Sequence, residues 1–433
     1  RYTSYPTAPH FHAGIDAQTY ASWLDALSPD ATLSLYLHVP YCHSICLYCG
    51  CHTKAVRRFA PVEAYAHHLE QEIALIAQRA GGRKVTHWHW GGGTPSIIGP
   101  DLMRSMHARI AGHFDLSDLR EHAIELDPRH LGDDMIAALN ATGVNRVSLG
   151  VQDFSAHVQE AIGRVQPFEQ VADAVMRLHR AGIKGVNIDL MYGLPKQTLD
   201  DVQNTARLAV SLGPQRLALF GYAHVPWFKT HQRVIDEASL PGIRARLDQA
   251  NAAAEVFLDA GFVAIGLDHF ARPDDELALA QEAGTLRRNF QGYTADMADA
   301  LLGLGASSIG RLPQGYVQNA VDMGSYGRAI ASGQLASAKG LAMNAADHLR
   351  GAIIERLMCD MVVNLDDFVC ATRAQLVFAD AFVQLKELQD AGVVELSGNT
   401  ITITERGRPL TRLAAACFDA YLAANQARHS RAV

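Results

Sequence analysis

The sequence contains no long hydrophobic run. No apolar stretch approaches the roughly 18–20 residues that a helix needs to cross a bilayer. The first ten residues, Arg1 to His10, are polar and contain prolines, so they do not resemble a secretory signal peptide. These absences predict a cytoplasmic protein without a membrane span. The first residue is not Met, and we expect the native start to be missing.

An excess of positive charge is also absent. Lysine and arginine number 38 against 45 aspartate and glutamate residues, which gives a formal net charge of −7. This balance argues against an extended nucleic-acid surface, because such surfaces are strongly basic. An anionic substrate would need a local cluster of Arg or Lys inside a pocket, since the overall field is mildly repulsive.

Cysteine is scarce and unevenly distributed. Four of the seven cysteines lie between positions 42 and 51, whereas Cys359, Cys370 and Cys417 are scattered through the last quarter. Scattered cysteines in a cytosolic protein are usually small buried hydrophobes. Disulfides at the density of the first group are typical of small secreted domains, which a chain of 433 residues is not. The first group therefore predicts a metal centre.

Short β-rich runs alternate with helical patterns between about residues 33 and 270. Strands are expected at 33–39, 84–90, 122–126, 146–151, 185–191 and 216–222. Helices are expected at 62–79, after Pro100, from Leu131, at 171–181 and at 200–211. The repeat of strand and helix predicts a parallel sheet with right-handed crossovers. Periodicity alone leaves open a partial barrel, a full barrel or an open doubly wound sheet.

The character of the chain changes after about residue 330. Helices are expected at 342–359 and 378–391, followed by a β-hairpin over 393–404 that turns at Gly398-Asn399. This order predicts a small, mainly helical, winged-helix-like domain. The basic segment 406–412 is interpreted as a solvated face. We expect an N-terminal arm (1–30), an α/β barrel domain with an extension (31–330) and a C-terminal domain (331–433).

Chemically useful residues recur where the predicted strands end. Gly91–Gly93 follow the second strand, Glu125 and Asp127 end the third, Gln152 ends the fourth and Asp189 lies in the fifth. In parallel α/β architectures, ligands bind at the carboxyl edge of the strands. The recurrence predicts one shared site at that edge.

The densest motif is CxxxCxxC, formed by Cys42, Cys46 and Cys49, with Cys51 two residues later. Cysteine thiolates are the usual ligands of iron–sulfur clusters. A structural zinc site normally has a second Cys or His pair roughly 12–20 residues away. Three ligands would leave one iron of a four-iron cluster open to an exogenous ligand, which is a catalytic feature. The spacing favours a 4Fe–4S cluster, and a structural zinc remains the alternative.

This motif resembles the signature of the radical S-adenosylmethionine (SAM) superfamily. It follows Tyr36-Leu-His-Val-Pro-Tyr41, and Gly91-Gly-Gly-Thr-Pro95 resembles the superfamily's segment that contacts the methionine amino group. Glycines permit close backbone approach to a ligand. The resemblance implies a partial (β/α)6 TIM-like barrel. It also implies that Cys42, Cys46 and Cys49 bind three irons while the methionine of SAM chelates the fourth.

Other segments resemble the oxygen-independent coproporphyrinogen III oxidases over nearly the whole chain. They are Arg1–Ala8, Gly150–Phe154, Asn187–Lys196, Asp268–Leu277, Asn289–Thr294 and Cys417–Tyr421. Cys51 is present in these enzymes, whereas related haem-carrying paralogues generally have a bulky hydrophobic residue there. The family's N-terminal arm implies that residues 1–30 cover the site.

The resemblance also implies which residues bind cofactor. The expected contacts of the cluster-bound SAM are Tyr36, Gly92, Glu125 and Ile309. The expected contacts of a second SAM are Tyr48, Gly93, Thr94, Gln152, Arg164, Asp189 and Ala223. Carboxylates can accept ribose hydroxyls, and Arg164 can pair with a carboxylate. Tyr36 and Cys51 are also expected to serve catalysis.

The implied reaction is anaerobic oxidative decarboxylation of two propionates of coproporphyrinogen III to vinyl groups. It gives protoporphyrinogen IX in haem biosynthesis, and a 5′-deoxyadenosyl radical from SAM starts it. A reduced flavodoxin or ferredoxin-like protein is the expected electron donor, and the chain is expected to be a monomer. Candidate propionate ligands are Arg1, Arg164, Arg272, Arg287 and Arg288. Asp268, His269 and Arg272 form a further candidate substrate cluster.

Three other functions stay open. They are a radical-SAM-fold haem chaperone, an anaerobic haem-degrading methyltransferase and a zinc-stabilised α/β protein. Cys51, the segment 1–8 and the long C-terminal domain argue against the first two.

Several residues also have a structural interpretation. The strand histidines His38, His87 and His89 are expected to be core residues with satisfied hydrogen bonds. Trp88 and Trp90 could belong either to the core or to a pocket wall.

Overall fold

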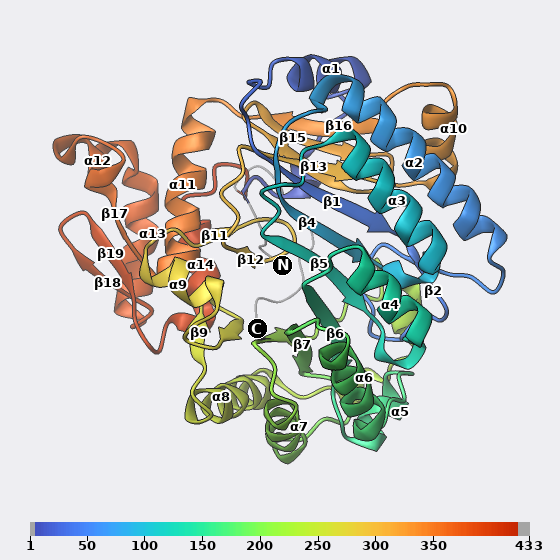
Figure 1. Cartoon of the computed structure of the whole chain (residues 1–433). Helices are drawn as coiled ribbons and strands as arrows, with labels where there is room; N and C mark the ends of the chain where they lie inside the picture. The colour runs from blue at the N-terminus through green and yellow to red at the C-terminus, as the bar shows by residue number, and fades with distance from the viewer. Residues whose placement is uncertain (1–4, 423–433) are drawn as a thin grey trace. The chain divides into compact units, whose positions relative to one another are not determined.

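The computed structural model describes residues 5–422, which form two compact units (Figure 1). The barrel unit comprises Phe11–Val256 and Asp296–Ala342, and the C-terminal unit comprises Arg1–His10, Phe257–Ala295 and Met343–Val433. The boundaries between these units do not fall at residues 30 and 330. The domain division expected from the sequence therefore stays a prediction. Within residues 5–422, no helix is both long and apolar enough to traverse a bilayer.

Six parallel strands form the centre of the barrel unit. In spatial and chain order they are β1 (Leu33–Val39), β4 (Val85–Gly92), β5 (Glu121–Leu126), β6 (Arg146–Gln152), β7 (Gly185–Tyr192) and β8 (Arg216–Gly221). The helices between them are α2 (Ala60–Ala80), α3 (Pro100–His113), α4 (Asp133–Ala141), α5 (Ala156–Ala161), α6 (Phe168–Arg180) and α7 (Leu199–Ser211). Figure 1 shows the major helices on the outer side of these strands. The predicted partial (β/α)6 architecture is confirmed.

Local sequence explains these elements. Strand β1 is buried along nearly its whole length, which suits a strand covered on both faces. Helix α7 starts at a capping box, in which Thr198 and Asp201 each accept the other's backbone N–H. Helix α3 starts with Pro100, whose missing N–H costs nothing in the first turn.

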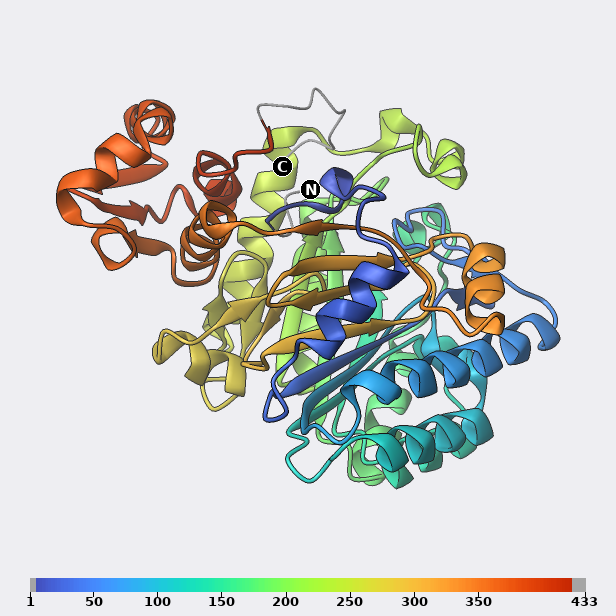
Figure 2. The same ribbon diagram turned by 90° about the horizontal axis from the view of Figure 1, so that it is seen from above.

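The expected extension of the barrel domain adds four strands to the sheet, and the sequence pattern did not predict these strands. Strand β13 (Ala300–Leu304) pairs parallel to the free edge of β1, and β14 (Ile309–Leu312), β15 (Gly315–Asn319) and β16 (Ser337–Ala342) continue antiparallel. Figure 2 shows α1 (Ala17–Asp25) lying across these orange strands. Helix α10 (Met323–Ala331) joins β15 to β16, and β2 (Tyr41–Cys42) pairs with β3 (Lys54–Ala55).

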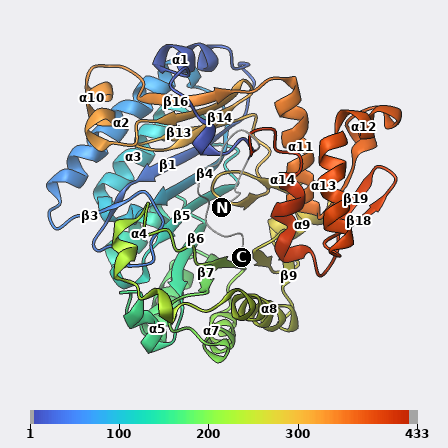
Figure 3. The same cartoon turned by 180° about the vertical axis from the view of Figure 1, so that it is seen from behind.

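The C-terminal unit has its own core. Its last part contains α11 (Ala345–Asp360), α12 (Ala371–Val377), α13 (Ala379–Asp390), α14 (Thr411–Ala416) and a three-stranded sheet of β17 (Val362–Asn364), β19 (Thr400–Ile403) and β18 (Val394–Ser397) (Figure 3). Leu357, Leu385, Ile401 and Phe418 are fully buried in the core. The predicted helices and hairpin are therefore confirmed.

The middle segment of this unit is built from short elements. They are β9 (Val263–Ile265), β10 (His269–Ala271), α9 (Glu276–Glu282), β11 (Arg287–Arg288) and β12 (Tyr293–Thr294), preceded by α8 (Ile243–Asp259).

The interpretation of segment 406–412 as a solvated face is wrong for two of its arginines. Arg408 donates to the carbonyl of Gly266 at 2.7 Å, and Arg412 pairs with Asp268 at 3.1 Å. The side chain of Arg412 is only 15% exposed. A charge run gives no sign of partners more than a hundred residues away, so the sequence could not reveal these contacts.

Candidate functional site

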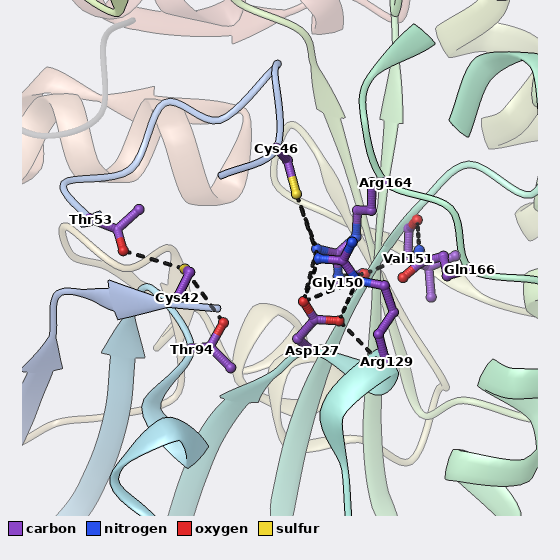
Figure 4. Close-up of polar contacts among 10 residues, drawn as sticks. All are labelled: Cys42, Cys46, Thr53, Thr94, Asp127, Arg129, Gly150, Val151, Arg164 and Gln166. Atoms are coloured by element: carbon purple, nitrogen blue, oxygen red, sulfur yellow. Dashed lines mark hydrogen bonds and ion pairs between the residues drawn. The ribbon is translucent and has the colours of Figure 1, made fainter. Parts of the chain in front are cut away.

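The loop after β1 carries the cysteine motif. The Cys42 sulfur contacts the hydroxyls of Thr53 at 3.3 Å and Thr94 at 3.5 Å. The buried Cys46 sulfur accepts from Arg164 at 3.5 Å and from Arg129 at 3.7 Å (Figure 4). Two guanidinium groups therefore converge on this sulfur.

Cys49 and Cys51 interact with each other near the exposed tip of the same loop. A hydrogen bond from Cys51 lowers the pKa of Cys49 to about 6, and the nearby His231 and Lys229 act in the same direction against the effect of burial. Cys49 therefore favours the thiolate, which is the form that binds metal, whereas burial raises the pKa of Cys42.

The donor set fits an iron–sulfur cluster better than a single ion. Among the residues that the structure describes, no three Cys, His, Asp or Glu side chains are arranged around one metal position. Cys42 and Cys46 have separate hydrogen-bond partners, as Figure 4 shows. The thiolates of a four-iron cluster likewise bind different irons rather than one shared ion.

A second segment fixes the cysteine loop from outside and was missed by the sequence analysis. Lys229 donates to the carbonyl of Cys51 at 2.8 Å, and the His231 ring contacts the carbonyl of Cys49 at 2.7 Å. The fully buried Gln232 donates to the carbonyls of Tyr48 at 2.9 Å and Ala223 at 3.3 Å. These residues follow no recognisable motif, so only the fold could identify them.

The glycines after β4 are required first by protein packing. A Cβ on Gly93 would lie 2.4 Å from both the Thr53 hydroxyl and the Tyr41 carbonyl. Gly92 has φ +115°, where residues with side chains are strained, and its Cβ would meet the His38 ring. The expectation that glycines serve close approach to a ligand is thus incomplete, because β1 and the cysteine loop already fill this space.

Glu125 lies at the centre of a polar group beside Gly92. Its carboxylate accepts from the backbone amide of Gly92 at 3.1 Å and contacts the His89 ring at 3.4 Å. Burial acts to raise the pKa of Glu125, but these contacts hold it below its usual range. Tyr36 stacks on His89 with ring centroids 5.9 Å apart. The structure therefore brings together three of the four residues expected at the cluster-bound SAM.

Ile309, the fourth residue, opens β14. The preceding turn is held by Tyr65, whose hydroxyl donates to the His38 carbonyl at 2.6 Å and accepts from the Ala306 amide at 2.9 Å. The turn also binds the buried Glu72, which accepts from the Gly305 amide at 2.6 Å. These contacts attach the start of β14 to the carboxyl end of β1.

Arg164 belongs to a buried ion-pair network rather than to the surface. It donates to Asp127 at 3.3 Å and to the Gly150 carbonyl at 2.5 Å, in addition to Cys46 (Figure 4). Arg129, which the sequence analysis missed, also pairs with Asp127 at 2.7 Å. Burial would raise the pKa of Asp127, but the two arginines lower it to about 2. The Nε atom of Arg164 is buried without a hydrogen-bond partner among the described residues.

Gln152 and Asp189 lie close to this network. The register of β6 shifts between Gly150 and Gln152, and Gln152 has φ +70°, an uncommon value for a residue with a side chain. This bulge directs the Gln152 amide to within contact of Gly150, beside Arg164. Asp189 accepts from Ser148 at 2.7 Å and from Asn187 at 2.9 Å.

Tyr48 and Ala223 are joined through Gln232, as described above. Tyr48 packs against a core cluster that contains Val158, Ile162 and Tyr222. Burial raises the pKa of Tyr48 well above its usual value, although Arg164 opposes this. Thr94 contacts Cys42, so the residues expected at a second SAM all border the same strand ends.

The structural interpretation of the strand histidines is confirmed for two of them. His38 is buried and bonded to Tyr36 and the His52 carbonyl, and His87 pairs with Asp296 at 3.1 Å. His89 differs, because it lies beside Glu125. Trp88 and Trp90 stack on each other and are buried, so they belong to the core.

The candidate substrate residues of the C-terminal unit fall into separate groups. Asp268 pairs with His269 at 2.9 Å and with Arg412, whereas Arg272 lies over the Phe262 ring and donates to the Ala260 carbonyl. The expected Asp268–His269–Arg272 cluster is therefore not formed.

Two of the proposed propionate ligands share a partner in this unit. Arg287 pairs with Glu355 at 2.8 Å, and the backbone amide of Arg288 donates to the same carboxylate. Arg1 lies outside the described residues.

Comparison with known proteins agrees with this geometry. Residues 36–209 match the family model of the radical SAM superfamily, and residues 343–410 match that of the HemN C-terminal domain. The oxygen-independent coproporphyrinogen III oxidase of Bradyrhizobium diazoefficiens is 51% identical and covers 100% of this chain and 97% of its own length. Its counterpart in Pseudomonas aeruginosa is 39% identical, with coverages of 100% and 96%. The solved coproporphyrinogen III oxidase of Escherichia coli, described as a radical SAM enzyme, superposes with a TM-score of 0.92 at 37% identity over 97% of each chain.

Proposed function

The chain belongs to the family of oxygen-independent coproporphyrinogen III oxidases within the radical SAM superfamily, and we propose from this premise how its residues perform the reaction. The protein is an oxidoreductase of haem biosynthesis that converts two propionates of coproporphyrinogen III to vinyl groups. A 4Fe–4S cluster and SAM are its cofactors. The observation that carries the proposal is the set of three cysteines at the carboxyl edge of a (β/α)6 sheet, beside Glu125 and Gly92.

Cys42, Cys46 and Cys49 hold the cluster, and Cys51 supports the loop without binding iron. The hydrogen bonds from Arg129 and Arg164 orient the Cys46 sulfur. Bound by Cys42, Cys46 and Cys49, the cluster would supply, together with SAM, the radical chemistry for hydrogen abstraction from the propionate. The chain's task is to position that carbon and to exclude water and oxygen.

The first SAM is held by Tyr36, Gly92, Glu125 and Ile309. Glu125 is kept ionised by His89 and the Gly92 amide, so it can accept hydroxyl or ammonium donors. The Tyr36 hydroxyl is already bonded to the His38 ring at 3.0 Å, which fixes the phenol beside the glycines.

A second SAM is held by the residues around Arg164. The buried Arg164 Nε has no hydrogen-bond partner among the described residues. It can therefore donate a hydrogen bond to a ligand acceptor such as a carboxylate. The other contacts are Tyr48, Gly93, Thr94, Gln152, Asp189 and Ala223. Cys51 and Tyr36 remain the proposed catalytic residues near the cluster.

The remaining assignments concern partners and place. The substrate's carboxylates are bound by arginines, of which Arg272, Arg287 and Arg288 are the described candidates in the C-terminal unit. A reduced flavodoxin or ferredoxin-like protein supplies electrons, and the enzyme works as a cytoplasmic monomer.

The test is an anaerobic assay with reconstituted protein, dithionite, SAM and coproporphyrinogen III, analysed by chromatography. Wild-type protein is expected to form protoporphyrinogen IX and to contain about four irons and four sulfides per chain. Cys46→Ser is expected to lose product formation and cluster together, because a hydroxyl is a poor iron ligand. Cys370→Ser, at an exposed cysteine outside the site, is the control and should keep both.

Two results would contradict this function. Stable haem binding without turnover would support a haem chaperone. Zinc as the sole metal after reconstitution would support a non-catalytic zinc protein.

A further inference from the structure

The tip of the cysteine loop reaches the protein surface between two cationic segments. Gly50, Cys51 and His52 are exposed. Segment 54–59 leaves the loop on one side, where the Val56 amide donates to the Cys42 carbonyl at 3.0 Å. Segment 227–234 lies on the other side and binds the carbonyls of Cys49 and Cys51. In Figure 3, β3 lies next to the yellow-green ribbon of the second segment.

Large apolar side chains project from both segments. The exposed fractions are 75% for Phe228, 71% for Val234, 51% for Trp227 and 49% for Phe59. A single exposed apolar residue needs no explanation, but a concentration of them around one loop is typical of an interaction site. Aromatic residues are particularly enriched at the centres of protein interfaces.

The charge of this face differs from that of the whole chain. Segment 54–59 contains Lys54, Arg57 and Arg58, and segment 227–234 contains Lys229 and Arg233, whereas neither contains a carboxylate. The net charge of the chain is −7. Acidic groups border the face: Asp322, which acts on Lys54 and caps α10, Glu63 in the first turn after segment 54–59, and Asp236 and Glu237 just after the second segment. The face is therefore a basic patch on an acidic protein, and it attracts an acidic partner.

We propose that segments 54–59 and 227–234 form the docking face for an acidic flavodoxin, with its exposed flavin edge against Trp227 and Phe228. This inference rests on the proposed function, because only a cluster held by the cysteine loop requires an external electron. One electron leaves the reduced flavin and enters the cluster. No bond in the protein forms or breaks in this transfer. The backbone contacts of Lys229 and His231 place the docked flavin next to the cysteine loop.

The test compares a protein donor with a chemical one. Phe228→Ser and the double variant Arg57→Glu/Arg58→Glu are reconstituted and supplied with either reduced flavodoxin or dithionite. Flavodoxin-driven turnover is expected to fall at least about tenfold through weaker association. Dithionite-driven turnover, iron content and the electron paramagnetic resonance spectrum of the reduced cluster should stay at wild-type values. Leu376→Ser and Arg373→Glu, at exposed positions of α12, are the matched controls and should change neither activity.

Direct binding gives a readout that does not need turnover. The Kd of flavodoxin for wild-type protein, with or without cluster, should rise with salt, and it should rise at least about tenfold in the variants. Wild-type affinity in both variants would overturn the proposal. It would also be overturned if dithionite-driven turnover fell equally, if only a ferredoxin bound this face, or if Phe228→Ser abolished self-association of the chain. Failure of wild-type turnover with dithionite would instead reject the proposed function.

Discussion

Buried charged side chains lie beside the cysteine loop. The carboxylate of Asp127 pairs with two arginines there. The side chains of Asp127 and Arg164 are 8% and 7% exposed, and Arg129 shares the same carboxylate. Removing one partner of a buried pair leaves the other charge uncompensated in a medium that solvates it poorly.

We therefore expect Asp127→Asn to lower the free energy of unfolding by about 3–5 kcal/mol. Asp133→Asn is the control, because Asp133 pairs with Arg177 on the surface and is itself 88% exposed. That change should cost less than about 1 kcal/mol. Denaturant unfolding of the two variants measures both effects, and equal losses would contradict the buried-pair argument.

Glu72 is a second buried carboxylate, distant from the cysteines in sequence. It accepts from Tyr326 at 2.7 Å, Asn319 at 2.6 Å and the Gly305 amide. Burial raises its pKa to about 7 from the usual 4.5, although these donors oppose the rise. Between those pH values the folded protein holds a proton that the unfolded chain has lost. The stabilisation from this group is complete below pH 4.5 and is lost as the pH rises through 7.

The expected outcome is a contribution on the order of 3 kcal/mol that disappears between pH 4.5 and pH 8. Glu72→Gln cannot titrate and should lack this part of the pH dependence. The measurement is the free energy of unfolding of both proteins across that range. Parallel curves for wild type and variant would show that the pKa of Glu72 is the same in the folded and unfolded protein.

At the scale of elements, the end of β4 and the cysteine loop are packed too tightly for a side chain at Gly93. Gly93→Ala would force apart the Tyr41 backbone and Thr53, which itself contacts Cys42. We expect this variant to assemble less than half of the wild-type cluster because overpacking displaces the loop. Gly50→Ala is the control, since its added methyl would meet nothing within 4 Å. Iron and sulfide analysis after reconstitution checks both.

The sequence was sufficient to predict the elements whose signal is local. Strand β1 was predicted with the bounds Leu33–Val39 because this short run of apolar and aromatic residues is interrupted only by Ser34 and His38. The edge where Glu125 and Gln152 meet followed from the parallel order of the strands. Element order therefore revealed the site before any contact was known.

Contacts between segments distant in sequence could not be predicted. Strands β13–β16 are short and join β1 from the other end of the chain. Arg129 and Gln232 act on the cysteine loop from 83 and 184 residues away, at the Cys46 sulfur and the Tyr48 carbonyl. The tight packing of Gly93 on Thr53 likewise depends on three-dimensional proximity alone.

At the scale of the whole molecule, the two compact units should respond differently to loss of the cluster. The cysteine loop, segment 54–59 and segment 227–234 all belong to the barrel unit, whereas β18 and β19 belong to the C-terminal unit. A group that binds the folded form stabilises the unit that holds it.

Removal of iron by a chelator is therefore expected to lower hydrogen-exchange protection in residues 41–59 and 223–240. Protection in β18 and β19 should change little, because they belong to the other compact unit. Mass spectrometry of exchanged peptides measures both regions. A uniform loss of protection would indicate that the chain unfolds as one cooperative unit.

The composition of the C-terminal unit from three separate chain segments has a consequence for synthesis on the ribosome. The β/α units of the barrel emerge in the order in which they pair, so they can assemble as they are made. Tyr5, in contrast, donates to Asp347 at 3.2 Å and packs in a core that also includes Phe418. Tyr5 must wait until residues 347–418 have been translated before its native partners exist.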